Sequence, residues 1–200
     1  MSEIVTGWLQ ANYTELAGAI LGIAYIIFSI RQNVLTWPTG LATSLLYIVI
    51  FFQARFYADM GLQFYYVFIS IYGWYLWKKG KPSDHASALP VSRTSATDWF
   101  RFSVAALLLF AGISWILKYH TDSPVPFGDA ATTALSIVAT YMLARKMIEH
   151  WLIWVVVDLV SAGLYICKGL WPTVILFLVY TVMAIIGFRE WNRELKNREL

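Results

Sequence analysis

The stretch His150-Trp-Leu-Ile-Trp-Val-Val-Val-Asp-Leu-Val-Ser-Ala-Gly-Leu-Tyr165 is apolar enough to cross a bilayer, yet it carries a carboxylate near its middle. At helical spacing its aromatic, small and polar residues share one face, which comprises Trp151, Trp154, Asp158, Ser161, Ala162 and Tyr165. The other faces are aliphatic, with Leu152, Val155, Val156, Leu159 and Val160. A carboxylate at the bilayer centre costs about 3 kcal/mol or more, so it normally faces a cavity or a partner. We therefore interpret Asp158 as the floor of a cation site walled by aromatic rings.

The composition excludes an ordinary soluble domain. Of the 200 residues, 59% are hydrophobic and 14% are charged, whereas soluble domains average about 25% charged residues. The net charge of +3 is spread over loops, which favours membrane orientation and argues against nucleic-acid binding. A single cysteine and three scattered histidines predict no metal site and no cofactor. We expect an all-α integral membrane protein.

Seven apolar segments are long enough to span a bilayer. They cover roughly residues 13–30, 35–53, 60–77, 99–117, 128–144, 149–167 and 172–189. With the N-terminus outside and the C-terminus inside, all but three of the 15 Lys and Arg residues fall on the cytoplasmic side. The three exceptions are Arg55, Lys118 and Lys168.

An internal repeat connects the first three segments with the last three. A shift of 114 residues matches identical residues at five positions: Arg31 with Arg145, Trp37 with Trp151, Tyr66 with Tyr180, Gly73 with Gly187, and Trp77 with Trp191. The single fourth segment restores the orientation of the second unit, so the repeats are predicted to be parallel with a site between them. The predicted organisation is a first repeat at 1–77, a cytoplasmic loop at 78–98, a linker helix and outer loop at 99–127, and a second repeat with its tail at 128–200.

The 114-residue shift aligns Asp158 with Ser44, so the two halves match in sequence position but only the second carries a charge there. Helix periodicity adds Ser44, Tyr47, Gln63 and Tyr66 of the first half as substrate-binding candidates. Four alternatives stay open. In the first, Asp158 is a structural carboxylate that is hydrogen-bonded to a Ser or Thr of the fifth or seventh segment. In the second and third, Trp151 is an interface anchor, and Trp74 and Trp77 belong to an aromatic belt. In the fourth, the tail after Arg189 is a frayed, solvated helix end.

Two runs carry a family resemblance. The first run comprises Trp37-Pro-Thr-Gly, Phe52-Gln-Ala-Arg-Phe-Tyr-Ala-Asp-Met60, Gln63 and Ile71-Tyr-Gly-Trp-Tyr-Leu-Trp77. The second run comprises Arg145-Lys and Glu149-His-Trp-Leu-Ile-Trp154. Over nearly its whole length the chain resembles the PnuC family of bacterial vitamin transporters, full-length relatives of the SWEET sugar-transporter fold. The resemblance implies facilitated uptake, across the bacterial inner membrane, of a vitamin precursor without phosphate. The family's substrates are nicotinamide riboside, thiamine or, in some members, riboflavin.

One departure leaves the substrate open, because Asp158 stands where the nicotinamide riboside members carry Asn. Nicotinamide riboside and thiamine are both aromatic cations with hydroxyl groups, so an anionic floor suits either. We favour nicotinamide riboside, with thiamine as the alternative and riboflavin third.

Other functional classes fit less well. An enzyme needs a nucleophile–base set that the apolar segments lack, and an ion channel favours rings of like chemistry, which the Ser44–Asp158 difference argues against. Whether the protein assembles as a homo-oligomer, such as a trimer, is left open by the sequence.

Overall fold

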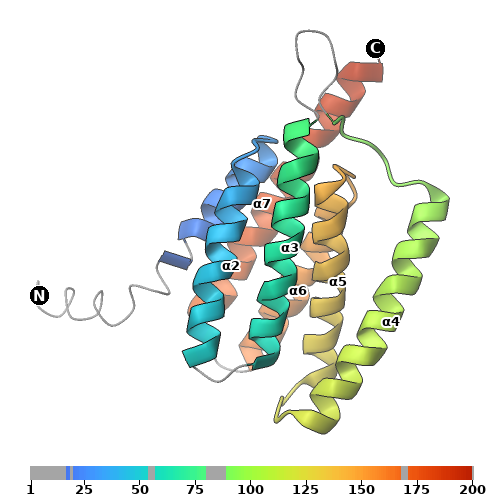
Figure 1. Cartoon of the computed structure of the whole chain (residues 1–200). Coiled ribbons are helices and arrows are strands. Elements are labelled where there is room, and N and C mark those ends of the chain that lie inside the picture. Colours follow the sequence, from blue (N-terminus) through green and yellow to red (C-terminus); the bar gives the residue numbers. More distant parts are fainter. Residues whose placement is uncertain (1–16, 19, 54–56, 80–88, 168–170, 200) are drawn as a thin grey trace, which may run out of the picture. The chain divides into compact units, whose positions relative to one another are not determined.

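The computed structural model describes residues 17–18, 20–53, 57–79, 89–167 and 171–199. These residues form a helix at Ile20–Ile30 followed by six longer helices (Figure 1). The six are α2 (Thr36–Gln53), α3 (Tyr57–Lys79), α4 (Ala96–His120), α5 (Pro126–Ala144), α6 (His150–Cys167) and α7 (Trp171–Glu199). The predicted all-α class is confirmed for this part of the chain.

Four of these helices are long and apolar enough to cross a membrane: Ala96–His120, Pro126–Ala144, His150–Cys167 and Thr173–Arg198. They match the predicted fourth to seventh spans. The helices Ile20–Ile30 and Thr36–Ile50 are apolar but shorter, and the first four residues of the predicted span 13–30 lie outside the described residues.

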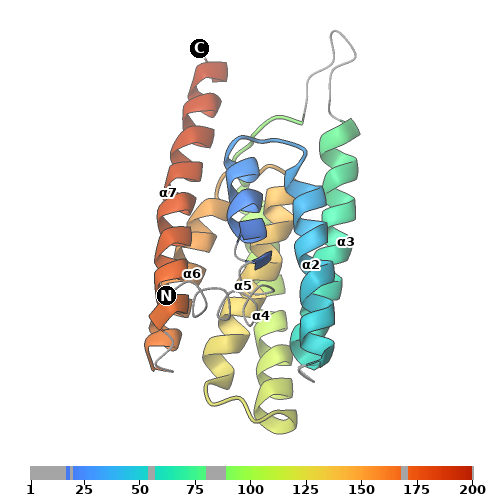
Figure 2. The same cartoon turned by 90° about the vertical axis from the view of Figure 1, so that its left-hand side faces the viewer.

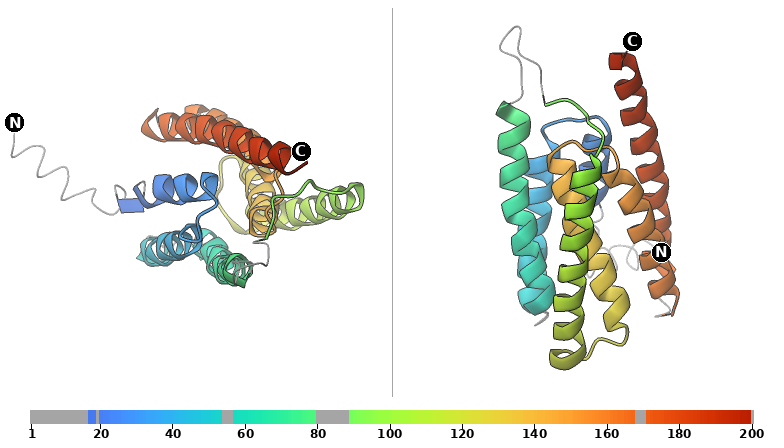
Figure 3. Two further views of the ribbon diagram at one scale, coloured as in Figure 1. Left: turned by 90° about the horizontal axis from the view of Figure 1, so that it is seen from above. Right: turned by 90° about the vertical axis from the view of Figure 1, so that its right-hand side faces the viewer.

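The chain divides into two compact units, Met1–Trp74 and Tyr75–Leu200, with the boundary inside α3. In the second unit α4 packs on α5, α5 on α6 and α6 on α7. Figure 2 shows α6 and α7 side by side, and Figure 3 shows α4 next to α5. Through most of its length α4 exposes apolar side chains, among them Phe100, Leu107 and Leu108, as a helix facing lipid does.

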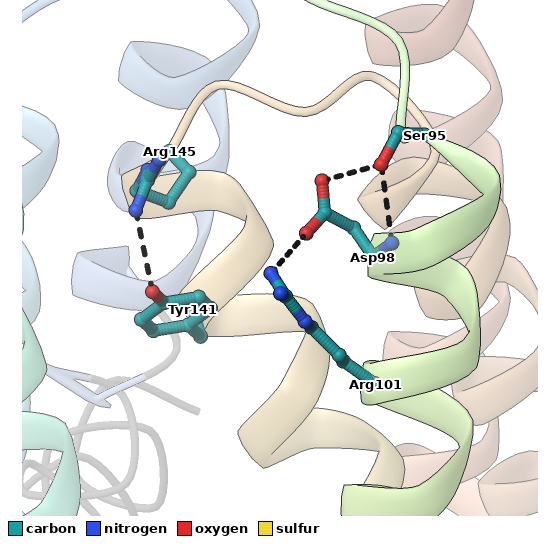
Figure 4. A network of polar contacts seen from close by, with 5 residues as sticks. All are labelled: Ser95, Asp98, Arg101, Tyr141 and Arg145. Atoms are coloured by element: carbon teal, nitrogen blue, oxygen red, sulfur yellow. Dashed lines mark hydrogen bonds and ion pairs between the residues drawn. The ribbon is translucent and has the colours of Figure 1, made fainter.

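The start of α4 is fixed by a polar cap (Figure 4). The Ser95 hydroxyl accepts a hydrogen bond from the Asp98 amide at 3.1 Å and donates one to the Asp98 carboxylate at 2.7 Å. Arg101 forms an exposed ion pair with the same carboxylate, and on α5 the Arg145 guanidinium donates to the Tyr141 hydroxyl. The cap satisfies amide groups that the first turn of a helix leaves without partners.

A short segment before α4 is bonded to the turn between α5 and α6. Ser92 pairs with Met147 as an isolated parallel β-bridge, in which the Ser92 amide donates to the Lys146 carbonyl and the Ile148 amide to the Ser92 carbonyl, both at 3.0 Å. The Thr94 amide and hydroxyl both donate to the Glu149 carboxylate, at 2.9 and 2.7 Å. The end of the loop predicted at 78–98 is therefore part of the second unit's packed structure.

Each unit contains a tight turn with the same geometry. Gln32 and Lys146 adopt left-handed φ values of 51° and 53°, and they are 114 positions apart. Backbone amides at the same offsets donate in both turns: residues 31, 32, 33, 36, 37 and 39 in the first, and 145, 146, 147, 150, 151 and 153 in the second. A left-handed conformation is costly outside glycine, so its presence at both places indicates that the turn geometry is needed.

In each unit a tryptophan packs against a glycine of a later helix: Trp37 against Gly73 of α3, and Trp151 against Gly187 of α7. A Cβ on Gly187 would lie 2.6 Å from the ring of Trp151, and a Cβ on Gly73 would overlap the ring of Trp37. Both indoles are buried. Glycine at these places lets the backbone approach an aromatic ring closely, as small residues do between membrane helices.

Two predictions about the membrane interface are wrong. Trp77 is buried and donates a hydrogen bond from Nε1 to the Ala144 carbonyl at 3.1 Å, so it is not part of an aromatic belt. The tail after Arg189 is regular helix to Glu199 and is not simply solvated, because it buries Trp191 and Leu195. Apolar residues at helical spacing within the charged tail give it an inward face.

Candidate functional site

The predicted polar face of α6 is its buried face. Trp151, Asp158, Ser161 and Ala162 are buried, and Trp154 and Tyr165 are partly buried. Leu152, Val156, Leu159 and Val160 are exposed on the opposite side. The face assignment is therefore confirmed, since a helix in lipid turns its polar side chains inward and its aliphatic ones outward.

Asp158 is buried and has no partner among the residues that the structure describes. Its side chain is 4% exposed, and its carboxylate makes no hydrogen bond or ion pair with any residue that the structure describes. On the two helices that pack against α6, the buried threonine hydroxyls bond within their own helices: Thr140 donates to the Ser136 carbonyl and Thr181 to the Phe177 carbonyl. The Thr132 hydroxyl also donates within α5, to the Gly128 carbonyl at 3.1 Å.

A buried polar group without a partner is uncommon in a folded protein, because the lost hydration is not replaced. Ser161, one turn further along α6, shares the feature: it is buried, and its hydroxyl has no hydrogen bond to a described residue. Two such groups three residues apart form a polar strip that is available to a ligand or to water.

Trp151 lies deeper in the unit than the anchor interpretation predicts. It is 3% exposed, its ring centroid is 4.5 Å from that of His150, and Trp191 meets it edge-on at 5.7 Å. The interpretation of Trp151 as an interface anchor is wrong, since an anchor sits at the membrane surface. Trp154 lies about one turn further along α6 and is the more exposed of the two indoles.

The far end of the polar face is aromatic. Tyr165 stacks on Phe177 of α7 with a centroid distance of 5.3 Å and an interplanar angle of 17°, and Phe177 meets Tyr180 edge-on at 6.1 Å. The stack fixes the orientation of the Tyr165 ring relative to α6 and α7.

In the first unit, Ser44 is buried and its hydroxyl has no hydrogen bond to a described residue, as is true of Asp158 at the aligned position. Tyr47 packs its hydroxyl end over Gly18, where an added Cβ would lie 2.5 Å away. Gln63 and Tyr66 are partly buried on α3, and Tyr66 contacts the ring of Tyr65. Each unit thus has buried polar groups among aromatic rings.

Comparison with known proteins identifies the family. The family model described as nicotinamide mononucleotide transporter matches residues 12–193, which is nearly the whole chain. The chain belongs to the PnuC family of vitamin transporters. The nicotinamide riboside transporter PnuC of Escherichia coli is 26% identical over 98% of this chain and 91% of its own length. The riboflavin/roseoflavin transporter RibM of Streptomyces davaonensis is 29% identical over 90% of this chain and 84% of its own.

A solved structure agrees in fold. The crystal structure of the vitamin B3 transporter PnuC superposes with a TM-score of 0.75 at 20% identity, covering 98% of this chain and 87% of that one. Membership of the PnuC family makes this chain a multi-pass membrane transporter and not an enzyme. The family resemblance seen in the sequence is confirmed.

Helical spacing within one segment does not indicate where the Tyr25 ring packs. The ring lies against Gly40 of α2, where an added Cβ would be 2.9 Å from Tyr25 Cε2 and 3.2 Å from Ser70 Oγ. A signal was present in the 114-residue shift, which aligns Gly40 with Trp154 and so pairs the smallest residue with the largest.

Proposed function

We propose that this PnuC-family member mediates facilitated uptake of nicotinamide riboside, a vitamin precursor without phosphate. The observation that carries the proposal is Asp158, a buried carboxylate without a partner among the described residues, on the aromatic face of α6. A cationic aromatic ring supplies what this face lacks, since it offers a positive charge for the carboxylate and a π surface for indole and phenol rings.

The nine predicted residues divide between the two units. The second unit supplies Asp158, Ser161, Trp151, Trp154 and Tyr165, and the first supplies Ser44, Tyr47, Gln63 and Tyr66. Asp158 takes the positive charge in this proposal, the aromatic residues stack, and the serines and Gln63 hydrogen-bond to hydroxyl and amide groups.

Nicotinamide riboside is favoured for two reasons. Relatives that cover most of this chain are nicotinamide riboside transporters, and the substrate is cationic. Thiamine is the alternative, because its thiazolium ring carries the same charge. Riboflavin ranks third although the relative RibM transports it, because a neutral flavin gains no ion pair from Asp158.

We also infer a parallel 3+1+3 arrangement with the N-terminus outside and the C-terminus in the cytoplasm of a bacterium, the protein residing in the inner membrane. The matching turns at Gln32 and Lys146 and the paired Trp–Gly contacts support the repeat. The asymmetry of Lys and Arg between the loops supports the orientation. A homo-oligomer such as a trimer stays an expectation.

The test is binding and uptake by purified protein. Calorimetric titration with nicotinamide riboside, thiamine and riboflavin identifies the substrate, and proteoliposomes then measure uptake without a Na⁺ or H⁺ gradient. Facilitated diffusion predicts equilibration of substrate across the membrane. Accumulation that an ionophore abolishes contradicts this mechanism.

Asp158→Ala is expected to weaken binding at least tenfold, since a charge-assisted hydrogen bond contributes about 1.5–3 kcal/mol and 1.4 kcal/mol is a factor of ten. Asp158→Asn is milder, because the amide keeps the shape and loses only the charge. Leu152→Ala, on the exposed side of the same helix, is the matched control and leaves affinity unchanged. Full affinity in a folded Asp158→Ala protein would return this residue to a structural role.

A further inference from the structure

Tyr25, Gly40 and Ser70 meet at one point inside the first unit. The nearest atoms to a Cβ placed on Gly40 are Cε2 and Cδ2 of Tyr25, at 2.9 and 3.2 Å, and Oγ of Ser70, at 3.2 Å. Three helices converge there: Ile20–Ile30, α2 and α3. The phenol ring occupies the space that any side chain at position 40 would need.

The second unit reverses the sizes at the aligned positions. Tyr25 aligns with Ala139, Gly40 with Trp154, and Ser70 with Ala184. Ala139 and Ala184 are both buried. An aromatic ring thus belongs to the interior of each unit, but the first unit supplies it from its first helix and the second from its middle helix. By this correspondence Tyr25 is the counterpart of Trp154.

The first unit differs from the second in one chemical respect. At the aligned positions Tyr25 and Ser70 carry hydroxyl groups, whereas Ala139 and Ala184 carry none. Neither the Tyr25 hydroxyl nor the Ser70 hydroxyl makes a hydrogen bond with a residue that the structure describes, although Ser70 is buried and Tyr25 partly so. Filling space alone requires only Phe and Ala at these places. Buried polar groups without a partner are uncommon, and a polar ligand can supply the missing hydrogen bonds.

We propose that Tyr25 and Ser70 are substrate-binding residues that hydrogen-bond to the hydroxyl groups of the transported vitamin. The inference rests on the proposed function and adds a specificity element to it. It assigns recognition of the sugar hydroxyls to the first unit, because a phenol and a serine hydroxyl can each donate and accept a hydrogen bond.

The test uses Tyr25→Phe, Ser70→Ala and the double variant, all of which keep the shape of the site. Each single change is expected to weaken nicotinamide riboside binding roughly 3–10-fold, the effect of one neutral hydrogen bond. Competition by 1-methylnicotinamide, which keeps the cationic ring and lacks the ribose, is expected to be unchanged. A purely structural role would weaken both ligands alike, so the ratio of the two affinities is the decisive readout.

Tyr119→Phe on α4 is the matched control. This tyrosine is exposed and lies far along the sequence from every proposed site residue, and the substitution removes the same phenol hydroxyl as Tyr25→Phe. Thermal melting of each variant in detergent establishes that it is folded. Undiminished riboside affinity in the folded double variant overturns the inference, and so does an equal loss for both ligands. If the wild type binds none of nicotinamide riboside, thiamine and riboflavin, the proposed function fails as well. If Asp158→Ala weakens binding and the double variant does not, only the inference on Tyr25 and Ser70 fails.

Discussion

Gly187→Ala tests whether the close approach of α7 to Trp151 is essential to the fold. The added Cβ would lie 2.6 Å from Cε2 and Cζ2 of the indole, where ordinary contacts begin at 3.4 Å. The ring, or the helix, must therefore move by about 0.8 Å, the difference between these distances. The ring has little room to do so, because it is 3% exposed and lies between His150 and Trp191.

Overpacking a tight interior costs about 1–3 kcal/mol. Replacing a helical glycine with alanine also gains about 0.5–1 kcal/mol from reduced backbone freedom, which would mask part of the loss. Gly163→Ala on α6 is the matched control, since a Cβ there meets nothing within 4 Å. The backbone gain is common to both variants, so their difference isolates the contact with Trp151 at about 1–3 kcal/mol.

The measurement is thermal unfolding of both variants in the same detergent, followed by tryptophan fluorescence. We expect Gly187→Ala to melt roughly 2–12 °C below Gly163→Ala, from the usual scaling for a domain of this size. Equal melting temperatures would refute the argument, because they would mean that the indole yields without cost. The same comparison for Gly73→Ala against Gly61→Ala probes the equivalent contact with Trp37 in the first unit.

Two further predictions concern the turn at Lys146 and the topology. Burial of the Lys146 ammonium lowers its pKa from 10.5 to about 8, so the unfolded chain binds more protons between those values. The folded state should therefore gain stability as pH rises from about 8 to 10.5, and Lys146→Met should remove this gain from the melting profile. For topology, with Cys167 replaced by Ser, a cysteine in the loop 78–98 should react only with a cytoplasmic reagent and one near Arg55 only with an external one. The reverse labelling pattern would overturn the orientation.

Much of the fold could be predicted because membrane helices follow simple rules of length and polarity. The inward face of α6 follows from spacing alone, since lipid accepts Leu152 and Val156 but not Asp158. The 114-residue shift likewise matches identical residues, and three of the five matched pairs lie in the two turns and the Trp–Gly contacts.

Other features could not be predicted, because they depend on which side chain fills a shared space. The position of Tyr25 over Gly40 requires knowing that two helices cross there, which periodicity within one helix does not reveal. The burial of Trp77 and Trp191 was missed for a related reason. Both lie near predicted helix ends, where hydropathy suggests an interface, but their rings lie 6.4 Å apart inside the second unit.

The bridge between Ser92 and Met147 has a consequence for biosynthesis. The strand segment precedes α4, whereas the turn that receives it is made only after α4 and α5 have left the ribosome. During synthesis α4 must therefore remain in the bilayer before the turn that bonds to Ser92 has been made. Its apolar surface allows this, since Leu107 and Leu108 are exposed even in the folded protein. The second unit closes late, when the segment before α4 pairs with a turn 55 residues downstream and ties the start of α4 to the helices that follow it.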